Sequence, residues 1–218
     1  HQLNYKSSNV AASSLIGHDV KIGKNSIIGA NCVIEDDVFI GTNSMIESNV
    51  TIKKGCQIGN NCVISPGVVV GSEGFGNART SDKKWNTIAH LGNVIIGNNV
   101  SIGANTTIDR GSISDTEIHD GVKIDNLIHI AHNVVIGEDT AIAAKTGIAG
   151  TTIIGKRCMI GGAVGIVDHL KITDDVSKTF TREYLFSYLK KILKKEKEYA
   201  LVLVSIDNLN DINTQYGI

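Results

Sequence analysis

The sequence is poor in the residues that fill and break most globular folds. It has one proline, and its aromatic residues make up 5% of 218 positions, whereas Ile and Val dominate the apolar fraction and glycine occurs 23 times. This composition favours many short strands over a helical bundle. The formal net charge is −1, and without an overall basic field the chain has no electrostatic support for binding nucleic acid.

Long apolar runs are also missing. No stretch approaches the roughly 20 consecutive apolar residues of a membrane span. The first ten residues, HQLNYKSSNV, lack the charged-then-apolar order of a signal peptide. We therefore expect a soluble, cytoplasmic protein. Because the sequence begins at His1 rather than Met, we also expect it to be a piece of a longer protein.

An aliphatic residue, almost always Ile, recurs every six positions over most of the chain. This period holds through residues 16–70, resumes over 96–108, and runs again over 118–172. Six residues form one short strand and a bend, and three such steps close a triangle, so 18 residues make one coil. The pattern predicts a mainly β protein, a parallel β-helix of roughly seven to eight coils.

Glycine often follows the repeated aliphatic residue, as at Gly17, Gly23 and Gly29. We expect these glycines to relieve the backbone where each coil turns. The cysteines share another phase of the repeat, four residues after the core aliphatic position. This phase predicts small, reduced core residues rather than disulfides or metal ligands. They are Cys32, Cys56, Cys62 and Cys158.

Two interruptions break the period. Residues 72–95 are too polar and glycine-rich for coils and predict a loop excursion from one corner. Long ordered loops in compact domains are usually functional. The slip of four residues around 111–117, GSISDTE, predicts a bulge at a corner.

The period ends after Thr173, which predicts a domain boundary between residues 177 and 178. Residues 181–198 have the pattern of an amphipathic helix, and 199–206 that of a buried strand, so we expect a short α/β segment over 178–218. VSIDNLNDINTQYG resembles the start of GGDEF diguanylate cyclase domains. Ser205 stands where that family has its first metal-binding aspartate, so we expect an inactive fragment in a chimeric chain.

Three residues are predicted to share one strip of surface. With 18 residues per coil, Gly150 lies directly above His132, and His169 lies two coils plus one residue from His132. An imidazole near neutral pH suits a general base, and a glycine N–H suits a donor to an oxyanion. The spacing therefore indicates acyl-transfer chemistry at this strip.

Several motifs in order resemble the UDP-3-O-acylglucosamine N-acyltransferase family of lipid A biosynthesis over residues 10–176. They are GFG (74–76), Trp85, TTIDRG (106–111), KIDNLIHIAHNVVIG (123–137), TGIAG (146–150) and CMIGGAVGIVDHLKI (158–172). The resemblance implies a left-handed β-helix and a homotrimer with sites between neighbouring prisms. It also implies a 3-hydroxyacyl donor on the phosphopantetheine of acyl carrier protein, a UDP-sugar lipid acceptor, no metal ion and no other cofactor.

Carried over by position, the resemblance makes His132 the general base, Gly150 the oxyanion donor and His169 a second histidine at the substrate. It places Asp125 and Asn126 near the sugar and the base. A corner turn explains Asp125 and Asn126 equally well, because Asx residues favour turns. Likewise, Asp109 and Arg110 are as readily a structural ion pair.

Two other functions remain open. One is an acetyl-CoA-dependent nucleotide-sugar acetyltransferase, and the other is a non-catalytic trimeric stem for the C-terminal segment. The family also has a uridine-binding domain before the β-helix and a helical extension after it. We expect this piece to lack both.

Overall fold

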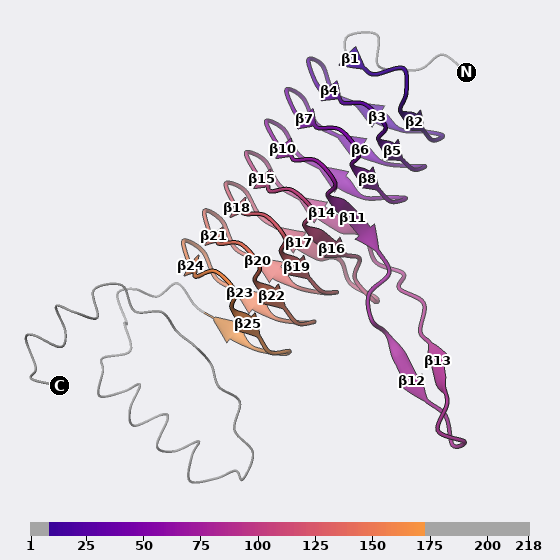
Figure 1. Cartoon of the computed structure of the whole chain (residues 1–218), viewed down its shortest axis with the longest axis vertical. Helices are drawn as coiled ribbons and strands as arrows, with labels where there is room; N and C mark the ends of the chain where they lie inside the picture. Colours follow the sequence, from indigo (N-terminus) through magenta and orange to yellow (C-terminus); the bar gives the residue numbers. More distant parts are fainter. Residues whose placement is uncertain (1–8, 173–218) are drawn as a thin grey trace, which may run out of the picture. The chain divides into compact units, whose positions relative to one another are not determined.

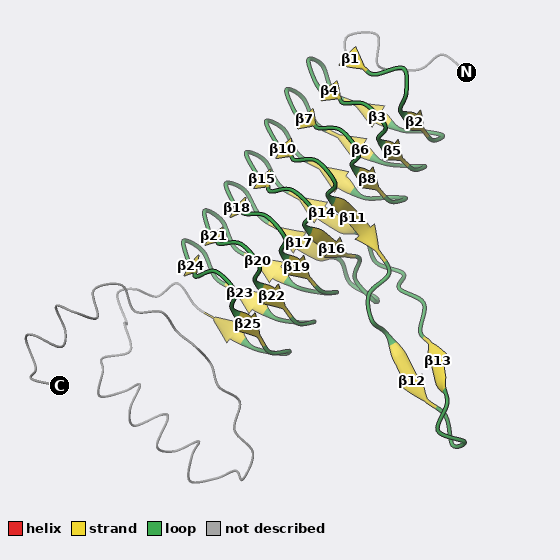
Figure 2. Ribbon diagram, viewed as in Figure 1, coloured by secondary structure: helices red, strands yellow, loops and turns green. Residues whose placement is uncertain are grey.

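The computed structural model describes residues 9–172, which form a parallel β-solenoid consistent with the left-handed β-helix. Three parallel sheets of eight strands each make its faces, and its secondary structure is strands and loops alone (Figure 2). The predicted fold class is confirmed. The predicted C-terminal segment lies outside the described residues and stays a prediction, as does the boundary between residues 177 and 178.

Each coil contributes one strand to each face (Figure 1). The first sheet contains β1 (Asn9–Val10), β4 (Ile27–Ile28), β7 (Met45–Ile46), β10 (Val63–Ile64), β15 (Ser101–Ile102), β18 (Lys123–Ile124), β21 (Ala141–Ile142) and β24 (Met159–Ile160). The second contains β2 (Leu15–Ile16), β5 (Val33–Ile34), β8 (Thr51–Ile52), β11 (Val69–Ser72), β16 (Thr107–Asp109), β19 (His129–Ile130), β22 (Gly147–Ile148) and β25 (Gly165–Ile166). The third contains β3 (Lys21–Ile22), β6 (Phe39–Ile40), β9 (Gln57–Ile58), β14 (Val94–Ile96), β17 (Thr116–Ile118), β20 (Val135–Ile136), β23 (Ile153–Ile154) and β26 (Lys171–Ile172).

The repeated aliphatic residues stack inward in columns. Ile130 pairs in register with Ile148, and Ile148 with Ile166, so the 18-residue step joins equivalent positions of adjacent coils. Most of these side chains are fully buried. Burying an Ile contributes roughly 1.5–3 kcal/mol, so the columns supply the core that the short strands lack individually.

The turn residue of each corner is not the glycine that we expected. The left-handed backbone conformation occurs three residues after the core Ile, and Asn or Asp often occupies that position, as at Asn25 (φ 62°) and Asp37 (φ 59°). Asn and Asp tolerate this conformation better than other side chains. The glycines after the core Ile have a different role. A methyl group on Gly23 would lie 2.4 Å from the carbonyl carbon of Gly41, so glycine there permits close stacking of coils.

Three of the four cysteines behave as predicted. Cys32, Cys56 and Cys62 are buried and unpaired, whereas Cys158 is half-buried. Burial raises the pKa of the Cys56 and Cys62 thiols. A raised pKa keeps these thiols protonated and unreactive near neutral pH.

The predicted excursion is confirmed and contains a hairpin. β12 (Asn77–Arg79) pairs antiparallel with β13 (Trp85–Thr87), and the hairpin projects from the second face next to β11 (Figure 1). Arg79 lies over the Trp85 ring, 5.7 Å from its centroid. The four-residue slip forms a short loop between β16 and β17, which we call the 111–115 loop.

Candidate active site

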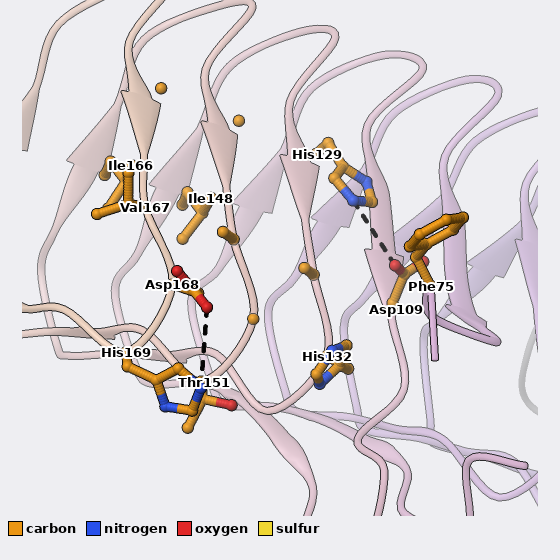
Figure 3. Close-up of a pocket in the computed structure, with 15 residues that line it drawn as sticks. Phe75, Asp109, His129, His132, Ile148, Thr151, Ile166, Val167, Asp168 and His169 are labelled. Carbon is orange, nitrogen blue, oxygen red and sulfur yellow. Dashed lines mark ion pairs between the residues drawn. The ribbon is translucent and has the colours of Figure 1, made fainter. Parts of the chain in front are cut away.

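A cavity of about 800 Å³ lies along the second face and its corner with the third. Its polar residues are His132, His129, Asp109, Asp168 and His169. Figure 3 shows His132 between two side-chain pairs, Asp109 with His129 on one side and Asp168 with His169 on the other. The remaining lining is largely small or apolar. It consists of Phe75, Ala131, Gly147, Ile148, Ala149, Gly150, Thr151, Gly165, Ile166 and Val167.

The predicted register of His132 and Gly150 is present. The Thr151 N–H donates to the His132 carbonyl at 3.0 Å, and the His169 N–H donates to the Gly150 carbonyl at 3.2 Å. A methyl group on Gly150 would lie 2.8 Å from Nε2 of His132. The structure thus brings together His132, Gly150 and His169 as the 18-residue step requires.

The N–H of Gly150 differs from the N–H groups at several equivalent corners. Those groups donate to a side chain of the next coil, as for Thr42 with Asn60 (2.8 Å) and Asn98 with Asp120 (2.7 Å). Within residues 9–172, the Gly150 N–H has no acceptor. A backbone donor beside an imidazole is the arrangement that stabilises an oxyanion during acyl transfer.

Asn133 fixes the tautomer of His132. Its Oδ1 accepts from the N–H of Ser112 at 3.0 Å, and its Nδ2 donates to the carbonyl of Ser114 at 2.7 Å, which together set the amide orientation. The same Oδ1 lies 2.9 Å from Nδ1 of His132. Because this oxygen only accepts, Nδ1 carries the proton and Nε2 has its lone pair free on the side of Gly150. The 111–115 loop therefore positions the His132 ring through Asn133.

Asp109 and His129 form a polar end of the cavity. This pair was not predicted from the sequence. Oδ2 of Asp109 lies 3.6 Å from Nε2 of His129, and Oδ1 accepts from the Ser72 hydroxyl at 2.9 Å. Burial raises the pKa of the Asp109 carboxyl, although the Ser72 hydrogen bond and the charges of His129, His132 and His90 oppose this shift. The sequence does contain a pattern that could have predicted His129. Side chains alternate along β19, so His129 faces outward next to the buried Ile130, three residues before His132.

Asp109 and Arg110 are not the ion pair that we considered. Asp109 pairs with His129, whereas the Arg110 guanidinium donates to the carbonyl of Lys54 at 2.6 Å and to Oδ1 of Asn93 at 3.0 Å. Arg110 directly follows β16, and its side chain joins the end of the excursion's returning limb, at Asn93, to Lys54 of a preceding coil. Its role is structural.

Asp125 and Asn126 lie at a different corner from His132, between the first and second faces. Oδ1 of Asn126 accepts from the Ala104 N–H at 2.7 Å, and Oδ1 of Asp125 accepts from the Asn126 N–H at 2.8 Å. These bonds make the corner turn that we considered. Within one chain, neither residue lines the cavity at His132, and their substrate role stays a prediction.

The described residues offer no alternative centre based on a metal ion. Across 9–172, no group of three His, Cys, Asp or Glu side chains is arranged to hold a metal. The same range contains no helix of the length and apolarity that crossing a membrane requires.

Comparison with known proteins agrees with the fold and the repeat. Residues 37–72 and 115–150 match the bacterial transferase hexapeptide (six repeats), and residues 19–54 match the hexapeptide repeat of succinyl-transferase. Over these residues the chain is similar to hexapeptide-repeat transferases.

Individual proteins that are similar to this chain are acyltransferases. A stretch of 32 residues is 69% identical to UDP-3-O-acylglucosamine N-acyltransferase of Vesicomyosocius okutanii, covering 15% of this chain and 10% of that protein. The solved structure of LpxA from Acinetobacter baumannii has 26% identity and a TM-score of 0.67, covering 75% of this chain and 62% of that one. A UDP-N-acetylglucosamine acyltransferase structure has 27% identity, a TM-score of 0.68, and coverages of 76% and 62%. The chain thus spans about a tenth of its curated relatives and less than two thirds of these solved chains.

Proposed function

We propose that this β-helix is the catalytic part of an N-acyltransferase that moves a 3-hydroxyacyl chain from acyl carrier protein to the 2-amino group of a UDP-3-O-acylglucosamine. The observation that carries the proposal is the pairing of His132 with the unbonded N–H of Gly150. The short, 69% identical match to a UDP-3-O-acylglucosamine N-acyltransferase supports this choice of acceptor and donor.

The reaction follows from the tautomer of His132. Nε2 removes a proton from the sugar's 2-amino group as its nitrogen attacks the thioester carbonyl of the donor. Negative charge then develops on the carbonyl oxygen, and the Gly150 N–H donates to it. Collapse of this intermediate forms the amide and breaks the C–S bond, and the phosphopantetheine thiolate takes the proton back from His132. No further cofactor is needed for this balance.

The lining of the cavity fits two chemically different ligands. Asp109, His129 and His169 offer hydrogen bonds to the hydroxyl groups of a sugar, whereas Gly147, Ala149, Gly165 and Val167 leave an apolar path along the second face. Methyl groups on Gly147 and Gly165 would meet no atom within 4 Å, so the path is open there. An acyl chain suits such a surface.

The homotrimer remains part of the proposal. The second face is bounded by two corners. Asp125 and Asn126 lie at one of them and His132 lies at the other. In a trimer, a neighbouring prism would bring its own corner residues to the cavity at His132. Sites between prisms would give these two residues the substrate role that the resemblance implies. Measuring the mass of the protein in solution tests the trimer directly.

A second candidate is O-acylation of UDP-N-acetylglucosamine, which the two solved acyltransferases favour. The two reactions separate by acceptor. Purified protein is incubated with 3-hydroxyacyl carrier protein and either UDP-3-O-acylglucosamine or UDP-N-acetylglucosamine, and products are identified by mass spectrometry. We expect an amide product from the amino sugar. An ester from the N-acetylated sugar alone would replace our proposal with the second candidate.

Acetyl-CoA serves as the second donor in the same assay. Incorporation of acetyl groups with no transfer from 3-hydroxyacyl carrier protein would indicate a nucleotide-sugar acetyltransferase instead. Absence of any product from all donors, in protein whose thermal unfolding is cooperative, would favour the non-catalytic stem.

A further inference from the structure

The projecting part of the excursion, residues 73–91, has a single buried residue. This residue is His90, with 5% of its surface exposed. It stands on the strand-free segment that returns from β13 to β14. One buried imidazole in an otherwise exposed or half-buried segment suggests that this imidazole has a specific task.

His90 packs directly on His132. The two ring centroids lie 5.2 Å apart, with the planes inclined at 63°, so the rings meet edge to face. Aromatic rings at this spacing and inclination attract each other through their quadrupoles. The contact restricts the orientations that the His132 ring can adopt.

The outgoing limb of the excursion closes over both rings. A methyl group on Gly74 would lie 3.0 Å from Nε2 of His90 and 3.1 Å from Cδ2 of His132. A methyl group on Gly76 would lie 2.5 Å from Cε1 of His90. Neither glycine has a positive φ, so it is the closeness of the rings, not backbone conformation, that explains glycine in the GFG motif.

The returning limb is fastened at both sides of His90. The Ile88 N–H donates to the Gly76 carbonyl at 2.9 Å, and the Leu91 N–H donates to the Ser112 carbonyl at 2.8 Å. Ser112 also donates to Asn133, the neighbour of His132. Both interruptions of the repeat therefore meet at His132, one through His90 and the other through Asn133.

The hydrogen bonding of His90 argues for a packing role and against proton transfer. Its Nδ1 lies 3.1 Å from the Ile88 carbonyl, which can only accept, so Nδ1 is protonated. Its Nε2 is buried and has no hydrogen-bond partner within the described residues. A buried unpaired acceptor costs free energy, and a proton added there would be enclosed without an acceptor of its own. The other titratable groups that line the cavity around His132 are Asp109, His129, Asp168 and His169.

We propose that His90 is a positioning residue, which holds the ring of His132 in the orientation that directs Nε2 toward Gly150. This rests on the proposed role of His132 as the base. His90 acts by its planar bulk and by its bond to Ile88, both of which glutamine supplies without a titratable group. The carboxamide of Gln can donate to the Ile88 carbonyl and lay its plane where the imidazole lies.

The test compares His90→Ala with His90→Gln, and uses Trp85→Ala in the exposed hairpin as control. Nitrogen-15 spectra of labelled histidines report which nitrogen of His132 carries the proton. Without the His90 ring, the His132 ring can turn and lose its bond to Asn133. We therefore expect His90→Ala to change His132 from the single Nδ1–H tautomer to a mixture, and His90→Gln and Trp85→Ala to preserve the wild-type signal. This readout requires no substrate, so it remains valid if the proposed reaction is wrong.

Kinetics with the acyl donor form the second arm. His90→Ala should lower kcat by about 10- to 100-fold with little change in KM, because a misplaced base weakens the transition state rather than binding. His90→Gln should retain both kcat and the pH–rate profile of the wild type. If His90→Ala fails to fold, Gly74→Ala displaces the same two rings from the other limb and should reproduce the loss. A wild-type tautomer in folded His90→Ala, or an altered pH–rate profile in His90→Gln, would overturn the proposal.

Discussion

The imidazole of His132 lies against the backbone of Gly150, although the two residues are a full coil apart in the sequence. A methyl group on Gly150 would lie 2.7 Å from Cε1 and 2.8 Å from Nε2 of that ring. The base and the backbone donor thus share one small volume, into which the reacting carbonyl must fit. This closeness is a consequence of the 18-residue coil and is the basis of the account.

Gly150→Ala should therefore inactivate the enzyme without unfolding it. Gly150 does not have a positive φ, so alanine suits its backbone, but the new methyl group must displace the His132 ring. We expect kcat to fall by about 100-fold. Gly162→Ala is the matched control, because Gly162 has the same position in the repeat, lies outside the cavity, and a methyl group there would lie 3.3 Å from its nearest atom, the Ala144 carbonyl oxygen. Equal activities of the two variants would show that the ring contact does not matter.

Asn133→Ala should reduce activity through the tautomer of His132. Losing the acceptor at Nδ1 allows the proton to move to Nε2, which removes the free lone pair, and we expect kcat to fall by about 10- to 100-fold. Asn49→Ala controls for backbone strain, since Asn49 (φ 62°) and Asn133 (φ 60°) both occupy the left-handed corner position. Both variants should lose thermal stability from that strain, and Asn133→Ala should lose more because it also loses the bonds of its amide to Ser112 and Ser114. Only Asn133→Ala should lose turnover, and a parallel loss in Asn49→Ala would contradict the prediction.

Asp109→Asn should stabilise the fold near neutral pH. Burial raises the pKa of Asp109 above its usual value of 3.8. Between the unfolded and folded pKa values the native protein retains a proton that the unfolded chain has released, so the free energy of unfolding falls as pH rises through this window. Above the folded pKa, the wild type therefore bears the full free-energy cost of burying an ionised carboxyl group. The Asp109→Asn variant has no such cost.

Thermal unfolding of wild type and Asp109→Asn across the acidic to neutral range measures this effect. The Tm advantage of the variant should be absent below pH 3.8 and reach its full size at neutral pH. A variant less stable than wild type at neutral pH would mean that the pairing of Asp109 with His129 outweighs the cost of burial.

Gly165→Leu should shorten the acyl chain that the enzyme accepts. Gly165 lies on the outer face of β25 and lines the cavity, and its outward side is open. A leucine side chain there would fill part of the proposed acyl path, so transfer of long chains should fall by about 10-fold or more while short chains are less affected, as for other hydrophobic pockets. Thr51→Leu on β8 places the same side chain on the same face outside the cavity. A proportional loss for all chain lengths would contradict the assignment of the path.

The repeat made most of the architecture predictable from sequence. A six-residue period needs only local alternation and a bend, so Ile130, Ile148 and Ile166 could be stacked by counting alone. The same count put His132, Gly150 and His169 on one strip. Where the period holds, sequence separation is equivalent to spatial position.

The period could not predict contacts made by residues outside it. His90 reaches His132 through a hairpin whose path depends on hydrogen bonds to Gly76 and Ser112, and no spacing rule encodes that path. Asp109 and His129 are 20 residues apart because the 111–115 loop adds four residues to that coil, which obscured their pairing. The conformation of the corners was missed for another reason, since glycine after the core Ile is explained by stacking of coils rather than by φ.

The most direct measurement compares His132→Ala with His119→Ala in transfer from 3-hydroxyacyl carrier protein to UDP-3-O-acylglucosamine. His119 is a half-buried histidine at a corner; it pairs with Glu117 and lies outside the cavity. If His132 is the base, its loss should lower kcat by about 10²- to 10⁴-fold, and His119→Ala should keep the wild-type rate. Wild-type turnover by His132→Ala would contradict the account.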